Sequence, residues 1–134
     1  MVTREQLLEE ESRTVGEQLY HIDIKMFKSY VDTLASSPRT VGEQLIEKMA
    51  DATFKENVER LLSFLSKGSY SKNQLIVLMK DIKRTTLHVR MIQPLLALNM
   101  IALSEPEKPN SKNQKYTITS VGAKMITLNN AVIN

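Results

Sequence analysis

The two histidines, His21 and His88, are the first candidates for chemistry, because imidazole serves both as a metal ligand and as a general base. They are far apart in the sequence, and neither forms a metal-ligand pair at helical or zinc-finger spacing. Thr85 and Thr86 are close to His88, with Asp81 as the local carboxylate, but an exposed polar helix face explains these residues more simply than a nucleophile does. We therefore expect no enzyme, no metal site and no cofactor.

The uneven charge along the chain offers a second kind of chemistry, the binding of a polyanion. Residues 61–134 carry ten basic against three acidic side chains, a net charge of +7. Residues 1–60 carry eight basic against twelve acidic side chains, a net charge of −4. This asymmetry places a surface for a polyanion in the C-terminal half. The alternative is that the basic residues merely keep that surface soluble, and composition alone does not decide between the two.

Five polar side chains follow one predicted helix, from about Arg84 to Leu98, whose apolar stripe contains Leu87, Met91 and Leu95. They lie at its start and along its outward side, where they could reach base edges or phosphates in a major groove: Lys83, Arg84, Thr86, His88 and Arg90. The alternative is a solvated helix face with ordinary cations. Pro94 lies inside this helix and removes one backbone hydrogen bond, so we expect a bend.

A predicted β-hairpin follows this helix. Asn99 suits a left-handed helix C-cap, after which residues 101–104 and 115–119 form two antiparallel strands joined by the polar segment 105–114. This hairpin supplies further candidates for phosphate and minor-groove contacts: Lys108, Asn110, Lys112, Asn113 and Lys115. If three or four lysines each neutralise a phosphate, the log-log salt slope of binding should be about −3. Binding this weak would normally need a dimer.

The elements that must position these residues are two earlier helices and a short last one. Thr53 and Glu56 form a predicted capping box for a helix that ends at Lys67-Gly68, and Ser71 and Gln74 form another before a short apolar helix. Between them, Ser69-Tyr70 allows at most a single bridging strand, and a last helix begins at Ser120. Three helices followed by a strand, a loop and a returning strand indicate a winged helix-turn-helix, with the hairpin loop as its wing.

The fold class that we predict is mainly α with a small β-hairpin: a winged helix domain over residues 53–134, preceded by a helical linker or dimerisation segment over residues 1–52. That segment contains a perfect repeat, since Thr14-Val15-Gly16-Glu17-Gln18-Leu19 recurs at residues 40–45. Each copy has the pattern of a capping box and should begin a helix. An amphipathic helix is predicted between the copies, from about residue 23 to 35, ended by Ser36-Ser37-Pro38-Arg39.

This amphipathic helix has two interpretations. It offers a dimerisation surface, since Phe27, Tyr30 and Leu34 have little local core to cover, or it packs against its own winged helix domain. Because the chain lacks a run of roughly 20 apolar residues and a signal-peptide pattern, we expect a soluble, cytoplasmic protein with no membrane partner. The absence of Cys excludes disulfides and thiolate metal sites.

Residues from about Val58 to Lys124, roughly half the chain, carry a family resemblance. The run from Glu107 to Tyr116 is close to an Asp-Lys-Pro-Asn-Ser-x-x-Gln-Lys-Tyr wing, Pro94-Leu95-Leu96 matches a Pro-Leu-Leu in the recognition helix, and Ile101 opens the first wing strand. These features resemble the C-terminal winged helix domain of RecG-related ATP-dependent DNA helicases and transcriptional regulators of bacteria, which also occurs in many Fic-family proteins. The repeated Gly-Glu-Gln elements look like those that often precede this domain.

The sequence departs from that family at three positions. Asn99 stands where the family usually has Gly, Lys83 where it often has His, and His88 where it often has Arg. The changes in the recognition helix leave a DNA sequence preference open. A Gly-x-x-x-x-Gly-Lys-Ser/Thr phosphate loop and a Fic His-Pro-Phe motif are both missing from the sequence, so neither ATP hydrolysis nor Fic catalysis is carried over.

Two functions of different classes follow from this reading. The first is a DNA-binding transcriptional regulator, expected to be a homodimer on double-stranded DNA. The second is a winged helix used for protein interaction or oligomerisation without DNA, since a fold alone does not license a function. A shared cationic face on Lys83, Arg84, Arg90 and the wing lysines favours DNA, whereas an apolar or buried face favours a protein partner.

Overall fold

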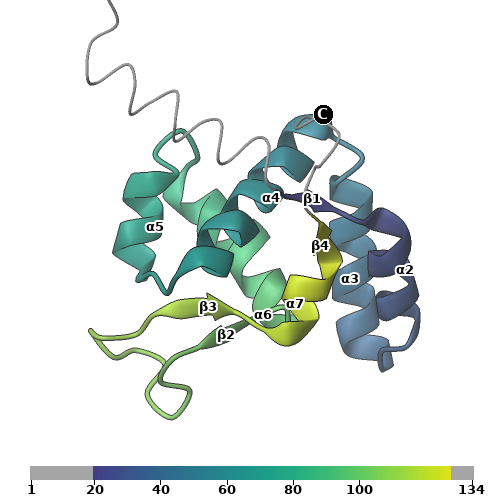
Figure 1. Ribbon diagram of the computed structural model, residues 1–134. Coiled ribbons are helices and arrows are strands. Elements are labelled where there is room, and N and C mark those ends of the chain that lie inside the picture. Colours follow the sequence, from purple (N-terminus) through teal and green to yellow (C-terminus); the bar gives the residue numbers. More distant parts are fainter. Residues whose placement is uncertain (1–19, 128–134) are drawn as a thin grey trace, which may run out of the picture.

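The computed structural model describes residues 20–127 and is mainly helical (Figure 1). Its elements run in this order: β1 (His21–Ile22), α2 (Ile24–Asp32), α3 (Ser36–Lys48), α4 (Ala52–Lys67), α5 (Lys72–Leu78), the π-helical η1 (Thr86–Ile92), α6 (Gln93–Ala97), β2 (Ile101–Leu103), β3 (Tyr116–Ile118), α7 (Ser120–Met125) and β4 (Ile126–Thr127). The fold class is thus the predicted one, consistent with a winged helix.

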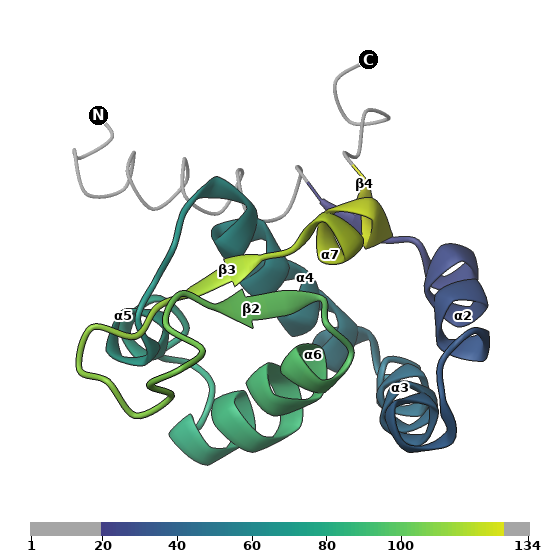
Figure 2. The same ribbon diagram turned by 90° about the horizontal axis from the view of Figure 1, so that it is seen from below.

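The predicted hairpin is confirmed as the antiparallel pair β2 and β3. Ile101 lies opposite Ile118, and Leu103 lies opposite Tyr116. The single bridge expected at Tyr70 is also present: the Tyr70 N–H donates to the Tyr116 carbonyl at 3.1 Å, and the Tyr116 N–H donates to the Tyr70 carbonyl at 2.8 Å. Seen from below, the hairpin lies beside the end of the helix that contains α6 (Figure 2).

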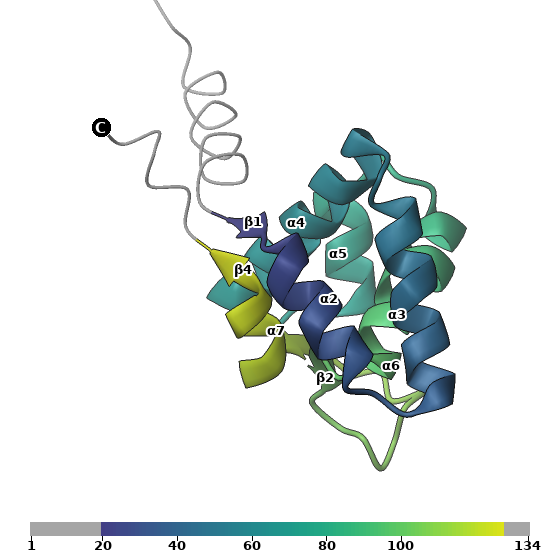
Figure 3. The ribbon, with the colours of Figure 1, turned by 90° about the vertical axis from the view of Figure 1, so that its right-hand side faces the viewer.

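One apolar core joins the N-terminal helices to the winged helix. Leu61 and Leu62 of α4 share a cluster of buried side chains with Phe27 and Val31 of α2 and with Leu45 of α3. Full burial of one such side chain contributes roughly 1.5–3 kcal/mol. Figure 3 shows α2 and α3 side by side against the rest of the fold.

Of the two interpretations of helix 23–35, packing against its own chain is the one observed. Phe27 is fully buried, and the Tyr30 hydroxyl donates to the Leu98 carbonyl at the end of α6, at 2.7 Å. The side chains that were candidates for a dimer contact therefore cover an intramolecular core.

The second copy of the repeat does not begin a helix, contrary to the prediction. The helix α3 already begins at Ser36, and the Thr40 hydroxyl donates to the Ser36 carbonyl at 2.9 Å instead of capping. Pro38 lies in the first turn, where its missing N–H leaves no bond unmade, so Ser36-Ser37-Pro38-Arg39 opens this helix rather than ending the previous one. The first copy, residues 14–19, lies outside the described residues.

The glycine of the repeat, Gly42, serves helix packing. A Cβ at this position would lie 2.6 and 2.8 Å from the two Val31 methyl carbons and 3.2 Å from Leu98 Cδ2. Only a residue without a side chain allows α3 to approach α2 and α6 this closely.

The two predicted capping boxes of the winged helix had different outcomes. The box at Thr53 is wrong, because α4 is capped by Asp51, whose carboxylate accepts from the N–H groups of Thr53 at 2.9 Å and Phe54 at 3.3 Å. The box at the start of α5 is confirmed: the Ser71 N–H donates to Gln74 Oε1 at 2.8 Å, and the Gln74 N–H donates to Ser71 Oγ at 3.2 Å.

The proposed recognition helix is irregular before Pro94. Residues 86–92 form the π-helical η1, with the Gln93 N–H bonded to the carbonyl of His88 five residues earlier, and α6 continues to Ala97. The disturbance expected at the proline therefore takes the form of a widened helix directly before it. Asn99 follows with φ of 59°, the left-handed conformation predicted for it.

The ends of the described chain meet in a sheet that the sequence did not predict. After α7, which begins at Ser120 as expected, β4 pairs with β1 so that His21 faces Thr127 and Ile22 faces Ile126. The N–H of Ile22 also donates to the buried Glu59 carboxylate at 2.7 Å. Within residues 20–127, no helix is both long enough and apolar enough to cross a membrane.

Candidate nucleic-acid interface

The ten predicted DNA-contact residues lie at the start of the helix from Arg84, along it, and on the wing. Most of them are exposed, whereas Thr86 and His88 are half-buried. The exposed ones are Lys83, Arg84, Arg90, Lys108, Asn110, Lys112, Asn113 and Lys115. They are therefore accessible, and the question is which of them lie together.

Three of the predicted residues meet in one polar groove, which we call the wing groove. It has a volume of about 380 Å³ and lies between the start of α5, the helix η1 and the wing, which runs below α5 in Figure 1. The side chains that matter for its chemistry are Lys72, Asn73, His88, Asn110, Lys112 and Tyr116. No carboxylate of residues 20–127 lines it. Lys72 and Asn73 were not predicted, because their part in the groove depends on the wing folding over α5.

The other predicted residues do not line the wing groove. Thr86 and Arg90 are each two positions from His88, and residues at that spacing lie on different sides of a helix. Arg84, four positions before His88, shares its side. The remaining candidates are exposed outside the groove: Lys83, Lys108, Asn113 and Lys115. The cationic residues after position 80 therefore occupy more than one surface.

Gln114, which sequence reasoning missed, holds the wing in shape. Its Oε1 accepts from the Glu105 N–H at 2.8 Å and from Ser104 Oγ at 3.3 Å, while its Nε2 donates to the carbonyls of Glu105 at 2.7 Å and Lys108 at 3.0 Å. The side chain is buried. The only signal for it was its place in the wing run that carries the family resemblance.

His88 has an unusual environment within the groove. Its burial, and then the positive charge of Lys72, hold the pKa of the imidazole below its usual value. Its Nε2 lies within hydrogen-bond distance of the Gln93 side-chain amide, with 3.2 Å to Gln93 Nε2. Nδ1 is buried and has no hydrogen-bond partner among the described residues.

An ion pair fixes the turn before this helix. Arg60 of α4 holds Asp81 through both carboxylate oxygens, at 2.9 and 3.2 Å, and this hydrogen bonding keeps the pKa of Asp81 below its usual value. The carboxylate nearest in sequence to Thr85 and His88 is therefore occupied by an arginine. The described residues also contain no cluster of three or more His, Cys, Asp or Glu side chains suited to a metal ion.

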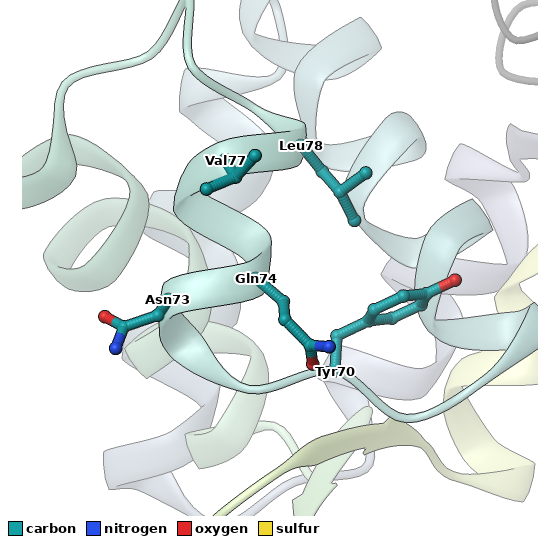
Figure 4. Close-up of a pocket in the computed structure, with 5 residues that line it drawn as sticks. All are labelled: Tyr70, Asn73, Gln74, Val77 and Leu78. Carbon is teal, nitrogen blue, oxygen red and sulfur yellow. The ribbon is translucent and has the colours of Figure 1, made fainter.

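A second, apolar pocket lies on the other flank of α5. It has a volume of about 370 Å³ and is lined by Tyr70, Asn73, Gln74, Val77 and Leu78, with Gln74 and Leu78 extending toward the Tyr70 ring (Figure 4). Val77 is 71% exposed and Leu78 is 38% exposed. The Tyr70 ring is braced edge-on by Phe64, with 6.4 Å between the ring centroids.

Comparison with known proteins gives one match. Residues 56–119 match the family described as "Filamentation induced by cAMP protein Fic-like, C-terminal domain". The matched span runs from α4 through β3, just under half of the chain, and includes every residue of the wing groove. No curated protein and no solved structure matches the chain. This part of the chain is therefore similar to a winged-helix-like module, and nothing in the comparison names RecG or a transcriptional regulator.

Proposed function

We propose that this chain is a DNA-binding winged helix module rather than an enzyme. It would act as a transcriptional regulator or as the DNA-binding C-terminal part of a RecG-related protein. The observation that carries the proposal is the wing groove, in which Lys72, His88 and Lys112 from three separate elements come together without a carboxylate. A polyanion is the partner that such a lining favours, because phosphate contacts from basic side chains supply most non-specific DNA affinity.

The helix side that carries Arg84 and His88 would enter the major groove. These two residues are four positions apart and His88 lines the wing groove, so base-edge contacts from the helix and backbone contacts from the wing are compatible with one duplex. Thr86 and Arg90 are on a different side, and Arg90 would reach only a flanking phosphate. Lys108 and Lys115 would add backbone contacts outside the groove.

A homodimer in the cytoplasm is the form in which we propose that the module acts. A few lysines per chain give weak binding, and two copies on two half-sites would raise the affinity. The contact between copies would have to use surfaces other than the buried Phe27 side of α2. Sedimentation of the chain with and without a duplex would give the stoichiometry, and one chain per duplex at saturation would exclude the dimer.

A salt-series titration with mixed duplex DNA tests the DNA-binding proposal. The parent is compared with a Lys83→Ala, Arg84→Ala, Arg90→Ala triple variant, and Lys48→Gln on α3 is the control for a general change of charge. We expect a log-log slope of about −3 for the parent and a shallower slope for the triple variant. Equal affinity of parent and triple variant would remove this helix as a DNA contact, and no binding at low salt would remove DNA as the partner.

Protein interaction is the second candidate, favoured by the apolar pocket on α5. A largely exposed Val77 next to Leu78 and the Tyr70 ring provides an apolar patch of the kind that marks contact surfaces. The variant Val77→Glu would abolish binding of a protein partner while leaving DNA affinity within about twofold. Loss of DNA binding in Val77→Glu, with an unchanged fold, would mean that this patch belongs to the DNA interface instead.

A further inference from the structure

We propose that the wing groove is a phosphate site for a nucleotide, either a nucleotide within a DNA strand or a free nucleoside monophosphate. The inference rests on the proposed function where the phosphate belongs to DNA, and it adds Lys72 and Asn73 of α5 to the interface. A volume of about 380 Å³ exceeds the needs of a single ion and lies within the range of small-ligand pockets, about 300–1,000 Å³.

The side chains that line the groove provide the positive charge and the hydrogen-bond donors that a phosphate group requires. Lys72 of α5 and Lys112 of the wing both line the groove, so two of its walls carry a basic residue. Asn73 and Asn110 add amide donors, and Tyr116 adds a hydroxyl. Burial raises the pKa of Tyr116, which keeps that hydroxyl protonated and able to donate. A sugar-phosphate offers several acceptor oxygens to such a set of donors.

His88 supplies an independent reason for a ligand at this place. The ring Nδ1 is a buried polar atom without a hydrogen-bond partner among the described residues. Folded proteins rarely carry such a group without a ligand, an ion or a functional need. Burial, and then the charge of Lys72, disfavour a positive charge on the ring, and a bound phosphate would favour it.

Hydrogen bonds within the chain already hold two walls of the groove in place. Its wing wall is held by the four hydrogen bonds of Gln114 and by the bond from Ser111 Oγ to Glu105 Oε2, at 2.9 Å. The Glu105 carboxylate therefore accepts a hydrogen bond within the wing itself. Its α5 wall is held by the Ser71–Gln74 capping box. A site whose walls are already ordered loses little conformational entropy on binding.

The test follows backbone amide signals of the ¹⁵N-labelled chain during three titrations: inorganic phosphate, a mixture of nucleoside monophosphates, and a short mixed-sequence duplex. The parent is compared with Lys72→Gln and Lys112→Gln, and the control is Lys48→Gln on α3, outside the groove. We expect saturable shifts at Lys72, His88 and Lys112 in the parent. Each groove variant should lower the affinity derived from these shifts about tenfold, equivalent to about 1.4 kcal/mol. The spectra also report whether each variant is folded.

The titrations separate the two sources of phosphate. Groove shifts with the duplex alone would support a DNA phosphate, and saturable shifts with the monophosphates would support a free nucleotide. Duplex shifts confined to Arg84 and the outer wing lysines would overturn the phosphate site while leaving DNA binding intact. If Lys72→Gln and Lys48→Gln lower the affinity equally, the binding reflects the net charge of the chain and not the groove, and the inference is overturned. No shift with any probe would overturn both this inference and DNA binding.

Discussion

Tyr70 and Tyr116 exchange two backbone hydrogen bonds, of 3.1 and 2.8 Å, and so tie the segment before α5 to the second wing strand. This pairing gives the wing groove its two walls, because α5 starts two residues after Tyr70 and the wing ends just before Tyr116. The position of the wing relative to α5 is therefore set by the backbone. This backbone pairing brings Lys72 and Lys112 to the same groove.

Replacing Gln114 with Ala should loosen the wing. The change leaves the N–H of Glu105 and the carbonyls of Glu105 and Lys108 without their side-chain partner, and we expect a loss of about 1–3 kcal/mol in the free energy of unfolding. Hydrogen exchange would report faster exchange at residues 104–115. The control is Gln44→Ala on the exposed side of α3, which should change neither quantity appreciably. A wing as protected as in the parent would contradict the role given to Gln114.

Replacing Gly42 with Ala should destabilise the chain, although Ala is the better helix former by about 1 kcal/mol. The new methyl would lie 2.6 Å from a Val31 methyl carbon, and overpacking of this kind costs typically 1–3 kcal/mol. Chemical denaturation of Gly42→Ala, Val31→Ala and the double variant forms a cycle. The second substitution should partly rescue the first, and strict additivity of the two costs would count against a steric role for Gly42.

The N-cap of α4 can be identified by paired substitutions. Asp51→Ala should lower the free energy of unfolding by about 1 kcal/mol, because it removes the acceptor for the N–H groups of Thr53 and Phe54. Thr53→Ala should be nearly neutral, since the side chain of Thr53 does not cap the helix. The reverse order of the two effects in a urea titration would restore the capping box predicted from the sequence.

The left-handed backbone at Asn99 predicts which residues this position accepts. With φ of 59°, Asn99→Gly should keep or slightly raise the melting temperature, whereas Asn99→Val should destabilise the chain by about 1–2 kcal/mol or more. Thermal unfolding followed by circular dichroism measures both. Similar melting temperatures for the two variants would mean that the backbone relaxes out of this conformation.

His88 predicts opposite pH dependences for folding and for phosphate binding. Because the folded-state pKa of His88 lies below its ordinary value of 6.5, the unfolded chain takes up the proton first as the pH falls. The contribution of His88 to stability should therefore fall as the pH drops below about 6.5, and level off below the folded-state pKa. A phosphate between Lys72, Lys112 and His88 favours the charged ring, so phosphate affinity should instead rise over the same interval.

His88→Gln is the matched variant for this pH dependence, because it removes the titrating group and keeps a polar side chain. Its unfolding free energy and its duplex affinity should each vary less between pH 7.5 and 5.5 than those of the parent, and calorimetry in buffers of different ionisation enthalpy would show proton uptake on binding only in the parent. An identical pH profile in parent and variant would assign the titration to another group.

Local signals in the sequence were enough for most elements of the fold. The apolar stripe of Leu87, Met91 and Leu95 predicted the buried face of the helix from Arg84, and the Ser71–Gln74 pattern predicted a real capping box. Asn99 predicted a left-handed cap because few other residues adopt that conformation. The same kind of signal was wrong at Thr40 and Thr53, because a Thr-x-x-Glu pattern does not reveal whether the helix has already begun.

The chain's own residues determined that there would be helices, a cap and a polar hairpin, since these depend on neighbours a few positions away. Only the tertiary structure decided that α2 is covered by its own domain, that β1 meets β4, and that Lys72 faces the wing. These depend on contacts between segments distant in the sequence, where a pattern of three or four residues carries no information. For the same reason, His88 and Arg90 were grouped by closeness along the chain, yet a helix turns neighbours two positions apart to different sides.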